Sequence, residues 1–259
     1  MKTKLVVLAL VALMSYGLKR HYADASTEAL TWILAPTAQL AAAVTGVAFA
    51  AVPGEGYFST ERMFLIEKAC AGVNFMIAAF VMVAFALLHH ARSWRESATV
   101  VVLSLLASYV AAIVVNAARI VIALWLATRP MTWTSLTAAE IHRLEGIAVY
   151  FGGLLMLYAL VQRLDRRELK YALPLGCYYL VTLGVPLVNG ASAGDAFLAH
   201  ALIVLLVPPV LILVVIAARR LASHYPRRSV SAGSSLHARN AGSHAAAAVT
   251  RTSVPAPTR

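Results

Sequence analysis

Apolar residues in this chain come in long unbroken runs, and short polar segments separate them. Six runs have 18 or more residues, and these are 29–52, 63–88, 98–127, 141–161, 171–188 and 197–218. An α-helix rises about 1.5 Å per residue, so roughly 20 residues cross a hydrocarbon core of about 30 Å. The alternation typical of an outer-membrane barrel is missing. The pattern therefore predicts an all-α fold, a polytopic membrane helical bundle.

Two features leave the predicted number of crossings at seven or eight. The run 5–18 has only 14 residues, which fits either a signal-peptide core or a marginal first span. No Ala-x-Ala-like cleavage site directly follows it, which favours an uncleaved span. The run 98–127 has 30 residues. As a helix it would be about 45 Å long, so it must tilt, project or break near Asn116–Arg119.

Composition supports the membrane class and excludes several others. Hydrophobic residues make up 61% of the 259 residues and charged residues 13%, whereas soluble domains carry roughly 25% charged residues. The net charge of +11 therefore does not indicate a soluble nucleic-acid-binding protein. The two cysteines form no CxxC or Cys/His cluster, so they indicate neither a disulfide framework nor a zinc site, and the chemistry considered below needs no metal or cofactor.

Basic residues predict the domain boundary and the orientation. We assign 1–218 to the membrane domain and 219–259 to a tail, which has seven arginines and no acid and is typical of a disordered cytoplasmic segment. By the positive-inside rule, the basic segments at 92–95, 162–170 and 219–220 are cytoplasmic. The segments on the other side are then extracytoplasmic, and these are 53–62, 129–140 and 189–196.

Three reactive side chains fall at one depth when the runs are drawn as helices. Cys70, Arg119 and His142 lie 18, 21 and 19 residues from the cytoplasmic ends of their runs. These separations are about 27, 31 and 28 Å along a helix, which is the extracytoplasmic membrane boundary. A thiolate is a nucleophile, an imidazole transfers protons, and a guanidinium stabilises a thiolate or an oxyanion. The combination indicates acyl transfer through a thioester.

Six neighbouring residues are candidates for a supporting shell around these three. On a helix, residues three or four positions apart share a face, and small residues allow close helix approach. On these grounds the candidates are Glu67, Gly72, Asn74, Asn116, Glu145 and Gly146.

Each of these residues also has an ordinary structural interpretation, and the sequence leaves both open. A cysteine in an apolar span is usually a small apolar side chain, and this holds above all for Cys177. Arg119 could extend to the interface, and His142 could be an ordinary interfacial residue. The two glutamates could pair with their basic neighbours or with solvent. Ionisable groups within spans are nevertheless more often functional.

The motifs Cys70-Ala-Gly72, Asn116-Ala-Ala-Arg119 and His142-Arg-Leu-Glu-Gly146 occur in this order. This set resembles the exosortase/archaeosortase family of polytopic membrane cysteine transpeptidases. The stretch 69–76 is most similar to the exosortase K subtype. The resemblance covers about residues 60–160, and the gap between Arg119 and His142 is short for the wider family.

The resemblance implies a bacterial plasma-membrane enzyme with its active site facing the extracytoplasmic side. Its substrates would be exported proteins with a C-terminal sorting signal, made of a short motif, a membrane helix and a basic cluster. It implies that Cys70 attacks the peptide carbonyl, His142 shuttles the proton, and Arg119 stabilises the thiolate or oxyanion. An amine acceptor or water would then resolve the acyl-enzyme.

Two other functions compete with this hypothesis. A transporter or channel usually has its polar groups near the midplane on broken helices, often with buried acids. Here the polar groups gather at one face and no internal repeat is visible. The second competing function is that of a non-catalytic membrane scaffold that uses the basic tail as its contact. A serine intramembrane protease is not supported, because there is no Gly-x-Ser-x-Gly element.

Overall fold

The computed structural model describes residues 2–88, 90–129, 137–165, 171–188 and 197–221. The chain divides into two units, Met1–Pro209 and Val210–Arg259, and the architecture below is that of the first. Of the predicted tail, residues 219–221 end the last described helix, and 222–259 lie outside the described residues. The predicted connecting segment 189–196 and most of 129–140 also lie outside them.

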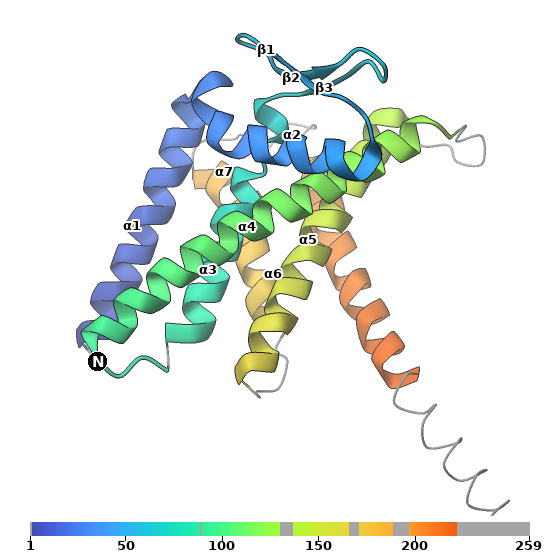
Figure 1. Ribbon diagram of the computed structural model, residues 1–259. Helices are drawn as coiled ribbons and strands as arrows, with labels where there is room; N and C mark the ends of the chain where they lie inside the picture. The colour runs from blue at the N-terminus through green and yellow to red at the C-terminus, as the bar shows by residue number, and fades with distance from the viewer. Residues whose placement is uncertain (1, 89, 130–136, 166–170, 189–196, 222–259) are drawn as a thin grey trace, which may run out of the picture. The chain divides into compact units, whose positions relative to one another are not determined.

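Helices make up most of the described chain (Figure 1). The labelled helices are α1 (Lys2–Asp24), α2 (Thr31–Thr45), α3 (Val73–Leu88), α4 (Trp94–Ala127), α5 (Ala138–Asp165), α6 (Ala172–Tyr179) and α7 (Val185–Val188). The shorter turns are the 3-10 segments η1 (Glu28–Leu30) and η2 (Lys68–Cys70) and the π-helical segment η3 (Leu180–Gly184). A further helix covers Phe197–Leu221.

Five helices in the described part are long and apolar enough to cross a membrane, and they are Lys4–Asp24, Lys68–Leu88, Trp94–Ala127, Glu140–Arg163 and Phe197–Leu221. The helix over Ala172–Val188 is apolar but shorter. The prediction of a mostly helical protein with membrane-length helices is therefore confirmed at this level. The described residues contain five candidate spans, where the sequence predicted seven or eight.

The segment 29–52 accounts for part of this difference. It was expected to be one span, but it forms α2, which has 15 residues, and then a strand. The helix ends at Gly46, whose φ of +73° is left-handed and whose N–H bonds to the Ala42 carbonyl at 2.8 Å. Figure 1 shows α2 lying across the direction of α1. Hydropathy alone does not detect such a stop within an apolar run.

The long run 98–127 is one unbroken helix, so it does not break near Asn116–Arg119. α4 has 34 residues. It begins at Ser93, whose side chain accepts the N–H of Glu96, while the carboxylate of Glu96 accepts the N–H of Arg92. Figure 1 shows α4 inclined to α3 and α5, the arrangement expected of a helix longer than its neighbours.

A small antiparallel sheet replaces the loop predicted at 53–62, so the fold is not purely α. The strands are β1 (Ala50–Val52), β2 (Gly56–Ser59) and β3 (Phe64–Ile66), in the order β1-β2-β3. Phe58 pairs with Ala50 on one side and with Leu65 on the other. Gly56 has φ +130°, and a Cβ there would lie 2.2 Å from the carbonyl oxygen of Ile66. Only glycine therefore fits this position.

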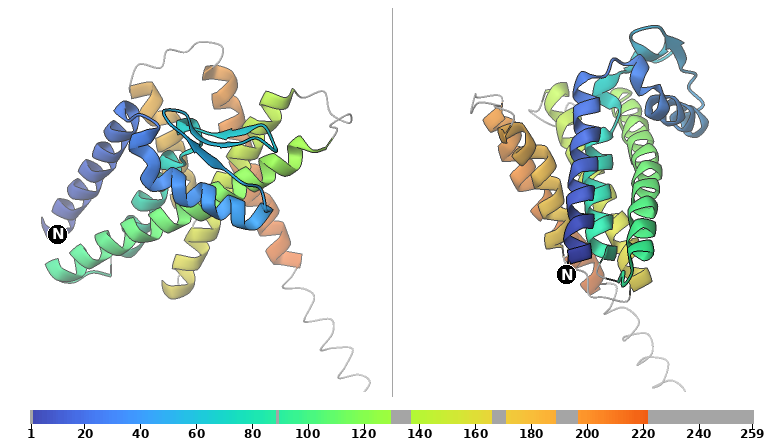
Figure 2. Two further views of the ribbon diagram at one scale, coloured as in Figure 1. Left: turned by 45° about the horizontal axis from the view of Figure 1, so that its top comes forward. Right: turned by 90° about the vertical axis from the view of Figure 1, so that its left-hand side faces the viewer.

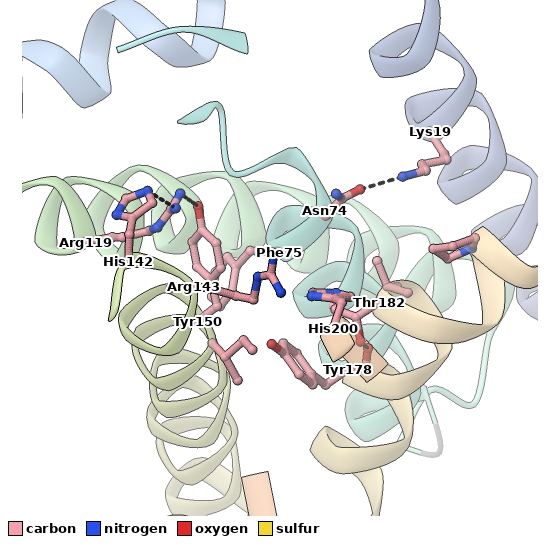
Figure 3. Close-up of a pocket in the computed structure, with 15 residues that line it drawn as sticks. Lys19, Asn74, Phe75, Arg119, His142, Arg143, Tyr150, Tyr178, Thr182 and His200 are labelled. Atoms are coloured by element: carbon pink, nitrogen blue, oxygen red, sulfur yellow. Dashed lines mark hydrogen bonds between the residues drawn. The ribbon is translucent and has the colours of Figure 1, made fainter. Parts of the chain in front are cut away.

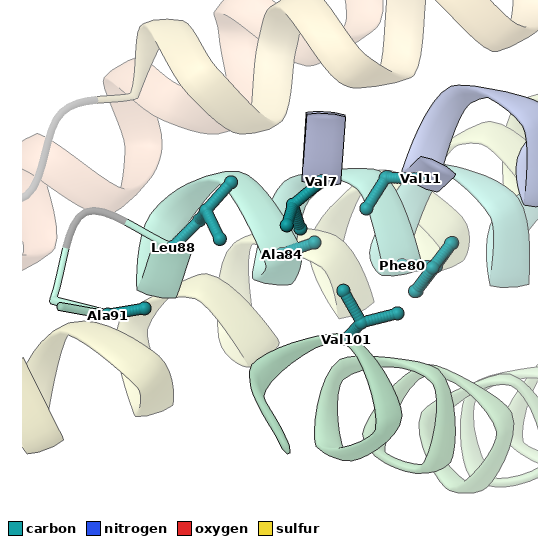
Figure 4. Packing of buried hydrophobic residues seen from close by; sticks show 7 residues of the cluster. All are labelled: Val7, Val11, Phe80, Ala84, Leu88, Ala91 and Val101. Carbon is teal, nitrogen blue, oxygen red and sulfur yellow. The ribbon is translucent and has the colours of Figure 1, made fainter. Parts of the chain in front are cut away.

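The core is centred on α3, most of whose side chains are buried. α1, α3 and α4 run side by side in the right-hand view of Figure 2. At one end of α3 an apolar cluster joins them, with Val7 and Val11 of α1, Phe80, Ala84 and Leu88 of α3, Ala91, and Val101 of α4 (Figure 4). A helix that is apolar on every side is expected to be buried in this way.

α4 turns its small side chains toward the bundle and its large ones outward. Its buried positions include Ser97, Ser104, Ser108, Ala112 and Asn116. Its exposed positions include Val102, Leu103, Leu106, Val110 and Val114. Small residues allow helices to approach closely within a bilayer, where a lipid-facing surface can be wholly apolar. This pattern is that of a membrane helix.

Candidate active site

Cys70 lies at the end of η2 and is not part of α3. Its N–H donates to the Glu67 carbonyl at 2.8 Å, and Glu67 itself is extended. Gly72, with φ +70°, then redirects the chain into α3. The continuous helix expected around Cys70 is therefore interrupted, because the left-handed glycine separates the cysteine from the helix that follows.

This interruption changes the roles expected for Glu67 and Asn74. The side chain of Glu67 is exposed, and its contact with Cys70 is made by the backbone. Asn74 does not share a helical face with Cys70. Its side-chain oxygen instead accepts a hydrogen bond from Lys19 Nζ of α1 at 2.8 Å. The structure therefore places the Asn74 side chain away from the thiol, whereas the exposed Glu67 carboxylate stays within electrostatic range of it.

Asn116 connects the Cys70 segment to the helices behind it. It is fully buried on α4. Its side-chain amide donates to the carbonyl of Cys70, and its oxygen accepts the hydroxyl of Tyr150 at 2.8 Å. A Cβ on residue 72 would lie 3.2 Å from Asn116 Cγ, so Gly72 leaves the room that this contact needs. Three segments distant in sequence thus meet at one amide.

Arg119, one turn further along α4, bonds to two residues of α5. Its Nη1 donates to the Tyr150 hydroxyl at 3.2 Å, and its Nη2 lies 2.9 Å from His142 Nε2. The guanidinium also stacks over the Tyr150 ring, 5.2 Å from its centroid. Figure 3 shows this group of side chains at one end of the cavity described below. Because these partners hold it, Arg119 does not extend toward the interface as a snorkelling arginine would.

The contact between Arg119 and His142 defines the state of the imidazole. Arginine stays protonated, so it can only donate, and His142 Nε2 must then accept. The proton of a neutral imidazole is therefore on Nδ1, which lies 3.5 Å from a carboxylate oxygen of Glu145. This places His142 between a cation at Nε2 and a carboxylate near Nδ1.

Glu145 and Gly146 complete the α5 side of the site. The Glu145 carboxylate is buried and lies 3.8 Å from Arg119 Nε. No hydrogen-bond donor in the described part of the chain meets its oxygens, so its contacts there are electrostatic. A Cβ on residue 146 would lie 3.1 Å from Arg119 Nε. Gly146 therefore allows the guanidinium to rest against the backbone of α5.

Arg119 also acts electrostatically on the Cys70 thiol. The Cys70 thiol is partly buried, and Arg119 and Glu145 both lie within electrostatic range of it. In contrast, Cys177 of α6 is buried with no ionisable neighbour acting on it. The two cysteines therefore differ in their surroundings, and among the described residues a cation acts on Cys70 but not on Cys177.

A cavity of about 340 Å³ opens beside this group (Figure 3). Arg119, His142 and Tyr150 line it, whereas Cys70 is not among its lining residues. Its other walls come from α1, α3, η3, α7 and the helix Phe197–Leu221. A molecule in the cavity would therefore meet the guanidinium and the imidazole directly.

Tyr150 is the main residue of this group that the sequence reasoning missed. It contacts both Asn116 and Arg119 through its hydroxyl. It follows His142 by eight residues, about two helical turns, so the two lie on one face of α5. That spacing was the available signal. Lys19, Arg143 and His200 also line the cavity, but no spacing in the sequence related these three residues to one another.

The side-chain types at this site indicate what chemistry it can perform. Within the described residues, no cluster of three or more His, Cys, Asp or Glu side chains could hold a metal ion. The site instead combines a thiol, an imidazole, a carboxylate and a guanidinium on neighbouring segments. Comparison with protein-family models, with curated proteins and with solved structures finds no match to this chain.

Proposed function

We propose that this protein is an integral-membrane cysteine peptidase or transpeptidase that acts on exported proteins. The observation that carries the proposal is the contact of Arg119 with His142 beside the segment that carries Cys70. These residue types can together form and resolve a thioester. The ordered motifs similar to those of exosortases support the same activity.

The first step forms the acyl-enzyme. Arg119 moves from His142 Nε2 to the substrate carbonyl oxygen, the freed Nε2 accepts the thiol proton of Cys70, and the thiolate attacks the carbonyl carbon of the scissile peptide bond. A C–S bond forms, and the electron pair of the C=O bond moves to the oxygen. Arg119 stabilises this oxyanion, and Glu145, 3.5 Å from His142 Nδ1, stabilises the imidazolium.

The second step releases the first product and regenerates the thiol. The oxyanion collapses, the C–N bond breaks, and His142 returns its proton to the leaving amine. An amine acceptor or water, deprotonated by His142, then attacks the thioester carbonyl. The C–S bond breaks, and the sulfur regains a proton from His142. The cycle needs no further reactant.

The position of the three residues supports a site at the extracytoplasmic boundary of the membrane. Cys70 and His142 each lie two residues after the start of their candidate spans, Lys68–Leu88 and Glu140–Arg163. Arg119 lies eight residues before the end of Trp94–Ala127, which runs the opposite way. A C-terminal sorting signal that crosses the bilayer would present its recognition motif at this level.

The test compares the C-termini of exported proteins by mass spectrometry in three strains. These carry the wild type, Cys70→Ala and the matched control Cys177→Ala. We expect proteins that lose a terminal membrane helix and basic cluster with the wild type and with Cys177→Ala, but not with Cys70→Ala. The mass of the new C-terminus identifies an acceptor or water. An identical truncation pattern with an equally abundant Cys70→Ala protein would overturn the proposal.

A transporter or channel is the second candidate. The cavity favours it, because the cavity lies between candidate spans and Cys70 does not line it. The two functions respond oppositely to Cys70→Ala. A transporter tolerates Cys70→Ala and is blocked by filling the cavity with Ala78→Phe, whereas a cysteine peptidase loses all activity in Cys70→Ala.

A further inference from the structure

One wall of the cavity carries positive charge that the proposed catalytic steps do not use. Lys19 of α1, Arg143 of α5 and His200 line it, in addition to Arg119 and His142. None of the described residues that line the cavity is an aspartate or a glutamate. The cavity is therefore basic on two sides, although it lies within a mostly apolar bundle.

Among the basic side chains on this wall, Arg143 has the most hydrogen-bond donors that no described residue accepts. Within the described residues it makes no hydrogen bond or ion pair. Glu140 acts on it electrostatically, but the Glu140 carboxylate bonds to the N–H and hydroxyl of Thr137 at 2.7 and 2.8 Å. Glu140 also does not line the cavity. The guanidinium thus offers its planar set of donors to whatever enters.

Arg143 and His200 face each other. Figure 3 shows their side chains extending toward one another in the middle of the cavity, and the two interact electrostatically. The permanent charge of Arg143 attracts an anion to this position, and the His200 imidazole can donate a hydrogen bond to the same anion. Phosphate suits this position, because it accepts hydrogen bonds from a guanidinium in a bidentate manner and from an imidazole at the same time.

Much of the remaining lining is apolar, although Asn74, Tyr178 and Thr182 also contribute polar groups. Ile147 and Val181, both buried, lie beside Phe75, Ala78 and Pro186. A cavity with both cationic and apolar lining, between helices that can span a membrane, fits an amphiphile better than a free ion. Basic pockets between membrane helices bind lipid headgroups by this combination.

We propose that this cavity binds the phosphate of an anionic phospholipid, held by Arg143 and His200 with Lys19 as a further cation. The apolar lining residues contact the first methylenes of the acyl chains. This inference does not depend on the chemistry proposed for Cys70, because none of these three residues takes part in it.

The test uses the purified full-length chain in a non-ionic detergent. Dioctanoyl phosphatidylglycerol, dioctanoyl phosphatidylcholine and inorganic phosphate are added separately, and bound lipid is counted by native mass spectrometry. Arg143→Gln and His200→Gln are compared with Arg95→Gln, which removes the same charge from an exposed position on α4. Melting temperatures without lipid check that each variant is folded.

We expect one phosphatidylglycerol to bind the wild type and Arg95→Gln at least tenfold more tightly than phosphatidylcholine. Arg143→Gln should bind it about tenfold more weakly, the factor that corresponds to one lost charge-assisted hydrogen bond. Equal binding by Arg143→Gln and Arg95→Gln, or equal affinity for the two lipids, would overturn the proposal. So would binding of inorganic phosphate as tight as that of the lipid, since the ligand would then be a free anion.

Discussion

The two ends of α3 are built on different principles. At its start, Asn116, Arg119 and Tyr150 from α4 and α5 each contact two or more specific partners. At its other end, Phe80 and its neighbours pack against α1 and α4 without a polar group among them. Apolar packing tolerates exchanges that keep the volume, whereas a buried polar network requires each partner in place. Substitutions should therefore affect stability at one end and activity at the other.

The substitution with the largest expected effect on this comparison is Arg119→Lys. Lysine keeps the charge but loses the planar fork that reaches both His142 and Tyr150. We expect the rate of C-terminal processing to fall about 100- to 1000-fold, as when an oxyanion-stabilising donor is removed. Quantitative mass spectrometry of processed substrate over time measures it. Arg95→Lys is the control and should keep the wild-type rate. If Arg119→Lys also kept the wild-type rate, the charge at position 119 would be sufficient and the planar fork of arginine would not be needed.

The apolar end should respond in the opposite way to Phe80→Ala. Phe80 is fully buried, and its truncation leaves a cavity among α1, α3 and α4. We expect a loss of about 3 kcal/mol in the free energy of unfolding, with unchanged activity per folded molecule.

Phe85→Ala is the matched control, because Phe85 is on the same helix and 47% exposed. Thermal unfolding in detergent distinguishes the two variants. A Phe80→Ala protein that keeps its melting temperature but loses activity would contradict the division between the two ends.

A pair of adjacent glycines tests the contact that brings α4 and α5 together. A Cβ on Gly153 would lie 2.6 Å from a methyl of Val115, whereas a Cβ on Gly152 meets nothing within 4 Å. Gly153→Ala should therefore separate the helices and cost about 1–3 kcal/mol of stability. Gly152→Ala should be neutral or stabilising by up to about 1 kcal/mol, because alanine favours a helix. Melting temperatures and processing rates of the two variants give the comparison.

The smallest expected effect is that of Tyr150→Phe. The ring keeps its stacking on Phe75, with centroids 5.7 Å apart, but the hydroxyl between Asn116 and Arg119 is lost. We expect a loss of about 1 kcal/mol in stability and a drop in processing rate of roughly tenfold. Tyr16→Phe, at an exposed position of α1, is the control. Equal rates for the two variants would show that the hydroxyl does not position Arg119.

Hydropathy was sufficient to predict the helices that carry the site. The runs 63–88, 98–127 and 141–161 lie within or overlap the candidate spans of α3, α4 and α5. Hydropathy also predicted that Arg119 and His142 lie at one depth in the membrane, because the depth of each follows from its distance along a helix. It failed at 29–52, where Gly46 ends the helix and a β-hairpin follows, since a left-handed glycine does not change the apolar character of a run.

The fine structure around Cys70 could not be predicted for a related reason. Spacing rules assume a continuous helix, and Gly72 interrupts it. Asn74 therefore lies toward Lys19, and Glu67 lies in an extended segment. In contrast, the rules succeeded in placing Asn116 near Arg119 and Glu145 near His142, because α4 and α5 are regular there. Tyr150 escaped notice because an aromatic residue in an apolar run is ordinary.

The network between α4 and α5 has a consequence for how the chain enters a membrane during synthesis. Asn116 and Arg119 are on α4, while Tyr150, His142 and Glu145 are all on α5. An arginine or asparagine that meets the bilayer interior alone is costly. The polar contacts of this end of α4 with Tyr150 and His142 therefore form only after α5 has been made, so the site is completed later in synthesis than the apolar contacts of α4 with α1 and α3.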